Sequence, residues 1–418
     1  MPAIKYSLEP SLDSKLKNGY KQTEVGVIPE DWEVTTVGEV CRLINGRGFK
    51  PYEWRTSGFP IIRIQNLNGS EVYNYFQGVY DKKLEINNGQ LLFAWSGSRG
   101  TSFGPHIWNG PTGLLNYHTW KVQINEQAVT PSFFLHALKE LTKFIEDRAH
   151  GASALVHTQK WEMEGYQFPL PPTKAEQEAI AEALSDTDAW IESLEALITK
   201  KRRIKEGTLQ ALLTGKQRLP GFSGEWEVKT LGEVVEIDPE NLSAGTPDSF
   251  QFNYISLEDI DRGTLRRHST QHFGTAPSRA RRALRANDIL VSTVRPNLQS
   301  HHIFTQPESN WVCSTGFCVL RCKPGVSHPD FIYFNFFANI INSQIDCLLT
   351  GSNYPAINSR DVRQLVIPCP RFDEQIAIGK TISDIDSEIS ALEVKLAKAH
   401  KLKQGMMQEL LTGKTRLI

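Results

Sequence analysis

A pair of long heptad-repeat segments constrains the fold of this chain more than any other feature. In the first segment, residues 174–215, apolar residues recur at alternating steps of four and three, which predicts a helix with one continuous seam. Its apolar seam residues are Ile180, Leu184, Ile191, Leu194 and Ile198. At 1.5 Å per residue this helix would be roughly 60 Å long. A seam of that length needs a partner helix.

The chain supplies that partner itself. Residues 371–414 repeat the heptad pattern, and each seam residue lies 198 positions after its counterpart (378 − 180 = 198). The second seam consists of Ile378, Ile382, Ile385, Ile389, Leu392 and Leu396. Glu176-Gln177 recurs as Glu374-Gln375, and the ending Leu-Leu-Thr-Gly-Lys occurs in both segments. An internal repeat of this length indicates a duplicated architecture, and it predicts two helices that pack as a coiled coil.

The ends and flanks of the first helix are also marked in the sequence. Thr173 can cap its start, with Glu176 completing a capping box, and Gly215 can supply the left-handed stop. A second row at seven-residue spacing widens the apolar face, as expected for a helix that packs against more than one partner. This row consists of Ala183, Trp190, Leu197, Ile204 and Ala211.

The repeat extends beyond the helices. Trp32-Glu33-Val34 recurs as Trp226-Glu227-Val228, so each unit of the repeat is a globular segment followed by a long helix. Both globular segments contain short strand patterns bounded by turns and one helix opened by a proline, Pro131 or Pro329, which predicts an α+β fold. The expected divisions are an N-terminal arm 1–24, a first domain 25–171, a central helix 172–216, a second domain 217–369 and a C-terminal helix 370–418.

Framework positions agree between the two globular segments, whereas loop positions differ. Two copies of one fold with divergent loops are typical of a protein that reads two different targets, although drift after duplication would also spare the framework. The arm, residues 1–24, is polar and aperiodic, so we expect it to dock elsewhere or to stay loose.

Composition and motifs exclude several classes of function. The 418 residues carry a net charge of −1, and no apolar run is long enough to cross a membrane, so we expect a soluble, cytoplasmic protein. We find no catalytic motif. Gly413-Lys414-Thr415 resembles the end of a phosphate-binding loop, but Gln408 stands where that loop needs glycine. Cys313, Cys318 and Cys322 lack metal-ligand spacing and are better explained as buried small hydrophobes.

Nucleic-acid features are clearer. Equivalent loops of the two segments mix arginine with hydroxyl and amide side chains, which suit phosphate oxygens and base edges. An arginine-rich stretch at 262–285 could clamp phosphates, with a solvated basic surface as the alternative. The basic run 200–205 is most simply a solvated helix face, and it could also follow a DNA backbone or receive an acidic partner. The candidate DNA-binding residues are Arg63, Gln65, Asn66, Ser96, Ser98, Arg99, Thr101, His157, Thr158, Lys160, Arg266, Arg267, Ser292, Thr293, Arg295, Asn297, Gln299, Asn353, Asn358 and Arg360.

Taken together, the paired Glu-Gln entries, the Leu-Leu-Thr-Gly-Lys exits and the segment openings GVIPEDWEV and GFSGEWEV carry a specific resemblance. The chain resembles the DNA-specificity subunit of a type I restriction-modification enzyme over essentially its whole length after about residue 20. The resemblance implies two target-recognition domains joined by two long antiparallel helices, in an arrangement with internal pseudo-twofold symmetry.

The resemblance also implies a function. Each domain would read one half of a bipartite, asymmetric site in double-stranded DNA, and the helices would set the gap and dock two modification subunits. Such a subunit is not an enzyme and holds no cofactor or metal. S-adenosylmethionine, ATP and magnesium would belong to the modification and restriction subunits. A stand-alone DNA-modifying or DNA-cleaving enzyme with fused recognition modules and a structural adaptor that binds protein are the alternatives.

Overall fold

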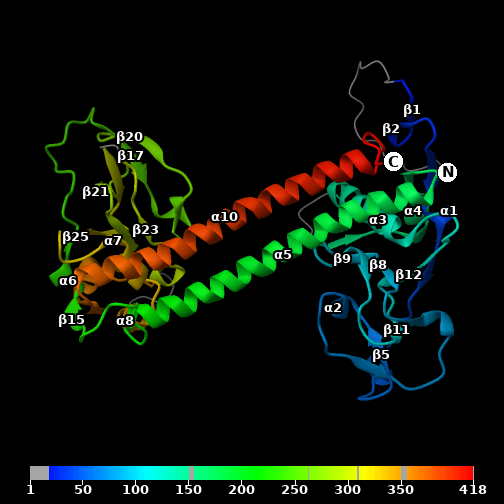
Figure 1. Cartoon of the computed structure of the whole chain (residues 1–418), viewed down its shortest axis with the longest axis horizontal. Coiled ribbons are helices and arrows are strands. Elements are labelled where there is room, and N and C mark those ends of the chain that lie inside the picture. Colours follow the sequence, from blue (N-terminus) through cyan, green and yellow to red (C-terminus); the bar gives the residue numbers. More distant parts are fainter. Residues whose placement is uncertain (1–17, 150–154, 262, 308–309, 350–354, 418) are drawn as a thin grey trace. The chain divides into compact units, whose positions relative to one another are not determined.

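The computed structural model describes residues 18–149, 155–261, 263–307, 310–349 and 355–417 (Figure 1). The chain divides into two compact units: unit 1, Met1–Ser193 with Leu396–Ile418, and unit 2, Leu194–Lys395. The long helices α5 (Lys174–Leu213) and α10 (Phe372–Leu410) each contribute one part to unit 1 and the other to unit 2. Each unit therefore combines one globular segment with part of each long helix.

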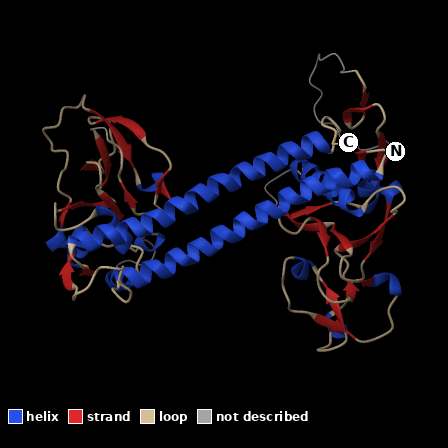
Figure 2. Cartoon of the chain, viewed as in Figure 1, coloured by secondary structure: helices blue, strands red, loops and turns tan. Residues whose placement is uncertain are grey.

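In unit 1 the globular segment is built from two four-stranded sheets with short helices (Figure 2). The sheet orders are β10-β8-β12-β4 and β6-β5-β11-β7, with the two-stranded pairs β1-β2, β13-β9 and β14-β3. The elements are β1 (Tyr20–Thr23), β2 (Gly26–Pro29), β3 (Glu33–Thr36), α1 (Val37–Val40), β4 (Cys41–Asn45), η1 (Pro51–Glu53), β5 (Phe59–Ile62), α2 (Ile64–Leu67), β6 (Asn74–Phe76), η2 (Lys82–Leu84), β7 (Glu85–Ile86), β8 (Leu91–Ala94), β9 (Ser96–Ser98), β10 (Gly104–Ile107), β11 (Gly113–Leu115), β12 (Thr119–Ile124), α3 (Pro131–Arg148), β13 (Leu155–His157), α4 (Lys160–Gly165) and β14 (Gln167–Leu170).

Unit 2 repeats this plan. Its four-stranded sheets are β16-β25-β22-β23 and β20-β17-β24-β21, with the pairs β15-β26 and β18-β19. The elements are β15 (Glu227–Thr230), α6 (Leu231–Val234), β16 (Val235–Ile237), β17 (Gln251–Ile255), η3 (Leu257–Asp259), β18 (Ile260–Asp261), β19 (Thr264–Leu265), β20 (Ser269–His272), β21 (Ala280–Leu284), β22 (Ile289–Ser292), η4 (Pro296–Leu298), β23 (His302–Ile303), β24 (Trp311–Ser314), β25 (Phe317–Cys322), α7 (Pro329–Asn335), α8 (Asn339–Leu348), α9 (Ser359–Gln364) and β26 (Val366–Cys369).

Two local expectations differ from the structure. The single helix expected from Pro329 onward is two helices, because Phe336, Phe337 and Ala338 each donate to the carbonyl three residues earlier and so tighten the chain into turns. The described part of the arm does not extend away from the fold. It supplies β1, which pairs with β2 of the first globular segment, and the Tyr20 hydroxyl donates to the Gly413 carbonyl oxygen at 3.1 Å.

Each unit has a core that joins its globular segment to both long helices. In unit 1, Phe133 and Phe134 of α3 belong to one cluster with Leu184 of α5 and Leu411 beyond α10. In unit 2, Phe331 and Ile332 of α7 cluster in the same way with residues of α5 and α10. The helices therefore belong to the cores of the units, and each unit is closed by segments far apart in the sequence.

Within each unit the two helices run antiparallel along the expected seam. Most seam residues are buried, namely Ile180, Leu184, Ile191, Leu194, Ile198, Ile378, Ile382 and Ile389, and the others, Ile385, Leu392 and Leu396, are half-buried. Ion pairs flank the seam: Asp188 with Lys403 at 2.5 Å in unit 1, and Lys205 with Asp386 at 2.5 Å in unit 2. The middle of the second apolar row is not covered, since Trp190, Leu197 and Ile204 are 36%, 39% and 45% exposed, whereas Ala183 and Ala211 at its ends are half-buried.

The repeated Glu-Gln pairs close the units at the helix starts. Thr173 caps α5 as expected, because its hydroxyl accepts from the Glu176 backbone N–H at 3.2 Å. The Glu176 carboxylate, expected to complete a capping box, is instead held by Arg416, which also bonds Asp31 at 3.0 Å and lies over the Trp32 ring. Gln177 accepts from the Thr130 backbone N–H at 2.8 Å and donates to the Pro171 carbonyl oxygen. The Glu-Gln pair thus links the start of the long helix to its globular segment through an ion pair of the carboxylate and hydrogen bonds of the carboxamide.

The same closure recurs in unit 2. Arg218 donates to both oxygens of Glu374 and lies over the Trp226 ring, while Gln375 accepts from the His328 backbone N–H. Gly215 and Gly413 end the helical repeats with φ of +69° and +68°, which confirms the left-handed stop expected from the sequence. In the part of the chain that the structure describes, none of the helices combines the length and apolar character that crossing a membrane requires.

Candidate nucleic-acid interface

The site begins where two parallel strands of unit 1 end. Strand β5 pairs in parallel with β11, so the chain segments that follow them emerge side by side. The Asn116 backbone N–H donates to the Ile62 carbonyl oxygen at 3.0 Å, which places the turn 116–118 beside the segment 63–67. Loops that gather at strand ends are common places for binding residues, because the sheet holds them rigidly.

Two further segments join this turn. The Trp95 backbone N–H donates to the His118 carbonyl oxygen, and Trp95 in turn accepts from the Thr158 backbone N–H at 3.0 Å. Strands β9 and β13 then pair Ser96 with His157. We name the group of segments 63–67, 95–102, 116–118 and 155–160 tip 1.

Unit 2 builds an equivalent group with the same backbone bonds. The Thr293 backbone N–H donates to the Gly316 carbonyl oxygen at 2.9 Å, and Thr293 accepts from the Ile357 backbone N–H at 3.0 Å. The parallel pair β17-β24 brings residues 256–261 beside this turn, and a Cβ on Gly316 would meet the Leu257 side chain at 2.6 Å. We name segments 256–261, 293–301, 315–316 and 355–360 tip 2.

Tips 1 and 2 hold most of the candidate residues, and many of those side chains face solvent. The exposed candidates in the tips are Gln65, Arg99, Thr101, His157, Arg295, Asn297, Asn358 and Arg360, and Arg266 and Arg267, which follow tip 2 segment 256–261, are exposed as well. The half-buried ones are Arg63, Ser96, Ser98, Lys160 and Gln299. Asn353 lies outside the described residues. Exposed amides, hydroxyls and guanidinium groups at the same end of a unit can form hydrogen bonds with base edges and phosphates.

Four candidates are buried and shape the loops instead. The Asn66 carboxamide donates to the carbonyl oxygens of Ser70 and Val72, and the Thr293 hydroxyl donates to that of Gly316 at 2.7 Å. Ser292 and Thr158 are buried as well, at 2% and 3% exposure. In this conformation these side chains contact the protein itself, and those contacts hold the exposed residues beside them in place.

The loop 295–299 of tip 2 has an unusual backbone. Arg295 and Gln299 adopt left-handed φ angles of 49° and 53°, and the short helix η4 lies between them. Left-handed backbone costs about 1–3 kcal/mol at a residue with a side chain, and it tends to occur at functional sites. Asn297 and the exposed Leu298 are therefore presented by a fixed loop.

The arginine-rich stretch 262–285 is not a uniform basic surface. Arg267 pairs with Asp259 at 2.8 Å and Arg285 with Glu240 at 2.9 Å, while Arg282 is largely buried against Asp238. Arg266 pairs with Asp261 at 3.3 Å. Because each partner offsets one charge, the phosphate-clamping potential of this stretch is smaller than its sequence indicates.

The basic run on α5 also pairs within unit 2. Lys201 pairs with Glu388, Arg202 with Glu393 at 2.6 Å, and Lys205 with Asp386. These contacts favour a role in fixing the helix pair over either a merely solvated face or a DNA-backbone contact.

Sequence reasoning missed four exposed apolar residues in or beside the tips. Leu155 and Tyr117 of tip 1 are 64% and 47% exposed, Trp161 on α4 is 60% exposed, and Leu298 of tip 2 is 57% exposed. Tyr117 precedes the strand pattern 119–124, so an aromatic residue at a strand boundary was the available signal. Its place beside Ser96 and His157 depends on contacts between distant segments, and a local pattern does not carry that information.

No group of three or more His, Cys, Asp or Glu side chains suited to hold a metal ion occurs among the described residues. Cys313 and Cys318 are fully buried in β24 and β25, and burial raises the pKa of the Cys318 thiol to about 11. Cys313 and Cys318 pack as small hydrophobes, as the sequence indicates, whereas Cys322 at the end of β25 is half-buried.

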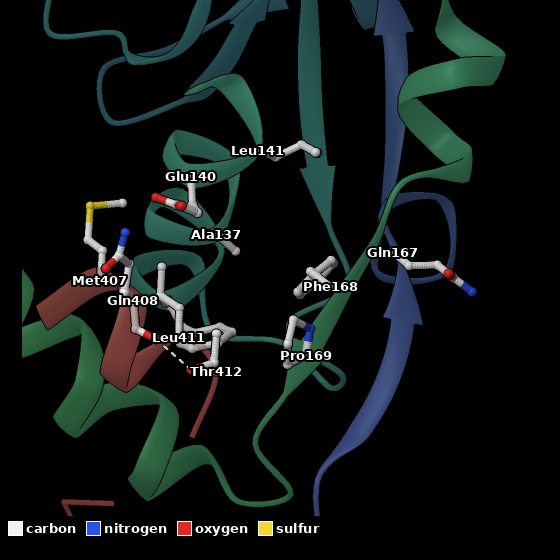
Figure 3. Close-up of a pocket in the computed structure, with 11 residues that line it drawn as sticks. Ala137, Glu140, Leu141, Gln167, Phe168, Pro169, Met407, Gln408, Leu411 and Thr412 are labelled. Carbon is white, nitrogen blue, oxygen red and sulfur yellow. Dashed lines mark hydrogen bonds between the residues drawn. The ribbon is translucent and has the colours of Figure 1, made fainter. Parts of the chain in front are cut away.

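A small cavity in unit 1 lies between α3, β14 and the end of α10 (Figure 3). Leu411 and Thr412 face Phe168 and Pro169 across it, and burial raises the pKa of the Glu140 carboxyl at its wall. Its volume of about 30 Å³ is enough for water, which needs only about 10–15 Å³ by this measure. The cavity is therefore a packing gap and too small for a nucleotide or cofactor.

Comparison with known proteins agrees with this arrangement. The family model "Type I restriction modification DNA specificity domain" matches twice, over residues 29–204 and 223–399. Similar proteins include the putative type I restriction enzyme MjaX specificity subunit of Methanocaldococcus jannaschii, at 26% identity over 96% of this chain and 97% of the relative. The MjaVIII specificity subunit of the same organism is 23% identical over 93% of this chain and 94% of the relative.

The same fold occurs in solved structures. The S subunit of a type I restriction-modification system from M. genitalium superposes with a TM-score of 0.58 at 16% identity, covering 95% of this chain and 98% of that one. A structure described as showing complex assembly and conformational transition of the type I R-M system gives a TM-score of 0.54 at 16% identity, covering 93% and 99%. The two family matches coincide with the internal repeat, each spanning a globular segment and most of the long helix that follows it. The chain therefore belongs to the family of type I restriction-modification DNA specificity domains and carries two of them in tandem.

Proposed function

We propose that this chain is the DNA sequence-recognition subunit of a type I restriction-modification complex, with each unit reading one half of a bipartite, asymmetric site. The observation that carries the proposal is that the two tips repeat the same backbone arrangement but present different side chains. Tips 1 and 2 share their backbone hydrogen bonds, whereas Tyr117-His118 in one corresponds to Thr315-Gly316 in the other. One scaffold with two sets of exposed side chains suits two different half-sites.

The long helices set the spacing between the half-sites. Both run as continuous helices, 40 residues in α5 and 39 in α10, and each belongs to both units. Half-sites read from one face of a duplex lie about one turn, 34–36 Å, apart or at multiples of that distance. A buried seam flanked by ion pairs makes a stiff spacer of that order of length.

The helices also dock the modification subunits. The part of α5 in unit 2 exposes Leu197 and Ile204, seven residues apart on one face. Apolar side chains in such a row, rimmed by charged residues, are typical of a helix that meets a protein partner. Two modification subunits, one for each copy of the repeat, are the expected complement, and restriction subunits join through them.

Catalysis belongs to those partners. The sequence carries none of the catalytic motifs that we sought, and the described residues contain no cluster suited to bind a metal ion. S-adenosylmethionine, ATP and magnesium are therefore expected on the modification and restriction subunits, and the complex acts in the cytoplasm.

Methylation mapping tests the proposal most directly. The chain is co-expressed with its modification subunit in a host that lacks related systems, and methyladenine is mapped across the host genome. A split motif with a fixed unspecified gap is the expected result. A continuous motif read by one unit alone would contradict the two-reader model.

Purified protein distinguishes the two rival functions. If the chain alone methylated or cut DNA, it would be a stand-alone enzyme. If an Arg295→Ala variant bound DNA as well as the unchanged chain in the assembled complex, a role as a protein-binding adaptor would gain support. Binding that weakens steeply with salt is the expected behaviour of a subunit that contacts phosphates.

A further inference from the structure

A column of aromatic rings runs from the core of unit 1 to the surface of tip 1. Phe93 and Trp120 are fully buried and stacked, with ring centroids 5.9 Å apart and planes 22° apart. Trp95 stacks on Trp120 at 6.0 Å and 24°, and its other neighbour is His118, at 5.2 Å. The last ring is Tyr117, 3.7 Å from His118 and 47% exposed.

This column holds Tyr117 in place. The Trp95 indole N–H donates to the Tyr117 carbonyl oxygen at 3.0 Å, so the ring beneath also fixes the backbone of the exposed residue. Gly48 lies against the Tyr117 ring, since a Cβ there would be 3.9 Å from Cδ1. The Tyr117 ring rests on an aromatic neighbour, and its backbone carbonyl is hydrogen-bonded. Such a ring loses little conformational entropy when it stacks on a ligand.

The surroundings of Tyr117 indicate what kind of ligand that is. Ser96 and His157 are paired across β9 and β13 in the same tip, and Arg63 follows the neighbouring strand β5. Tyr117 is thus an exposed ring in a tip whose other candidate side chains are polar or basic. Aromatic rings set beside basic and polar groups are typical of surfaces that stack nucleobases.

We infer that Tyr117 stacks on a nucleobase that is partly unstacked from the half-site read by unit 1. This inference rests on the proposed function and adds a specific contact to it. Among its described residues, unit 2 has no ring at the equivalent place, because Thr315 and Gly316 occupy the turn and Thr293 stands in the place of Trp95. The two half-sites are therefore read by different means, and unit 2 provides an internal control.

The test uses the full chain in complex with its modification subunits and a duplex carrying the mapped site, with 2-aminopurine replacing adenines of each half-site in turn. Replacing an aromatic ring that stacks on a base costs enough that Tyr117→Ala should weaken binding about tenfold. Tyr117→Phe should bind like the unchanged chain. The salt dependence should not change in either variant, because no phosphate contact is lost.

The unchanged complex should raise 2-aminopurine emission at one position of the unit 1 half-site, and Tyr117→Ala should abolish that rise.

Two further variants separate stacking from folding. Tyr117→Leu keeps an apolar side chain against His118 but has no aromatic face, so it should bind as weakly as Tyr117→Ala. Tyr52→Ala removes another exposed tyrosine of unit 1, on η1, and should leave affinity unchanged. Thermal unfolding of each complex checks that the fold is intact.

Several results would overturn the inference. Equal affinity of folded Tyr117→Ala and unchanged complexes would do so, and so would a loss in Tyr117→Phe as large as in Tyr117→Ala, which would assign the contact to the hydroxyl. In both cases the unchanged complex still binds its site, so the proposed function would stand. A complex that binds no duplex carrying the mapped site would refute both.

Discussion

At the scale of single residues, each unit is closed by a polar bridge around one buried carboxylate. Glu176 is only 2% exposed, and Arg416 and Asp31 complete a bridge from the end of the chain to its beginning. These hydrogen bonds raise the pKa of the Arg416 guanidinium far above its ordinary value. A buried carboxylate of this kind is stable only while its partner is present.

Arg416→Ala should therefore destabilise unit 1 by about 3–5 kcal/mol, because it leaves the Glu176 carboxylate buried and unpaired. The double variant Arg416→Ala, Glu176→Gln should be more stable than the single one, since no charge is then left unpaired. Chemical denaturation of the full chain measures both. If the single variant is as stable as the unchanged chain, the Glu176 carboxylate is hydrated by water once Arg416 is removed.

Buried histidines make the stability of the chain depend on pH. His301 is fully buried, with Nδ1 accepting from the Ser292 backbone N–H at 3.2 Å, and burial lowers its pKa from 6.5 to about 3. The folded state keeps the imidazole neutral, whereas the unfolded state takes up a proton below pH 6.5. The stability that this histidine contributes is thus complete above pH 6.5 and is lost as the pH falls towards 3.

Unfolding measured between pH 6.5 and 4 should show this proton as a slope of about 1.4 kcal/mol per pH unit. His136 of unit 1 adds a similar effect, because burial lowers its pKa to about 4. His301→Asn keeps an acceptor for Ser292 but does not titrate in this range, so its stability should fall less steeply with acid. Identical slopes in the variant and the unchanged chain would contradict this account.

How far the sequence predicts the site can be seen from single residues. Arg99, His157 and Asn297 are exposed in the tips as expected, because polar residues in turns between strands usually face solvent. Asn66 and Thr293 were expected to contact DNA and are buried. Their burial depends on backbone acceptors supplied by neighbouring loops, and residue type alone does not reveal it.

At the scale of elements, the long helices were the most predictable part of the fold. Their heptad pattern, caps and glycine stops are local, and the structure places α5 and α10 within a few residues of the expected limits. The break between α7 and α8 was not predicted, because it arises from tight turns that bury Phe336 rather than from a glycine or proline. The uncovered row containing Leu197 was expected to be packed, and a partner chain is the natural occupant.

The helix pair as a spacer leads to a prediction about its length. Inserting one heptad into α5 after Leu197 and one into α10 after Leu392 preserves both seams and lengthens the helix pair by roughly 10 Å. The mapped motif should keep both half-sites and change the length of the gap between them. A heptad inserted in α5 alone is the control, and it should disrupt pairing instead. An unchanged gap in the double insertion would refute the spacer model.

At the scale of the whole molecule, the duplicated plan makes recognition modular. Each unit has its own core and its own tip. The repeat made this duplication predictable from sequence. It could not show which segments meet in each tip, because the parallel pairs β5-β11 and β17-β24 join strands some 50 residues apart in sequence.

Modularity predicts that the two half-sites are read independently. His157→Ala in tip 1 and Asn297→Ala in tip 2 should each relax the motif in one half only, with a loss of discrimination of about 1–3 kcal/mol where the side chain contacts a base. Because distant residues without shared partners act additively, the double variant should lose the sum of the two effects within about 0.5 kcal/mol. Competition binding with duplexes altered in one half-site at a time measures each term. A double variant that loses much more than that sum would mean that the halves are read cooperatively, so that binding at one unit helps the helices bring the other into register.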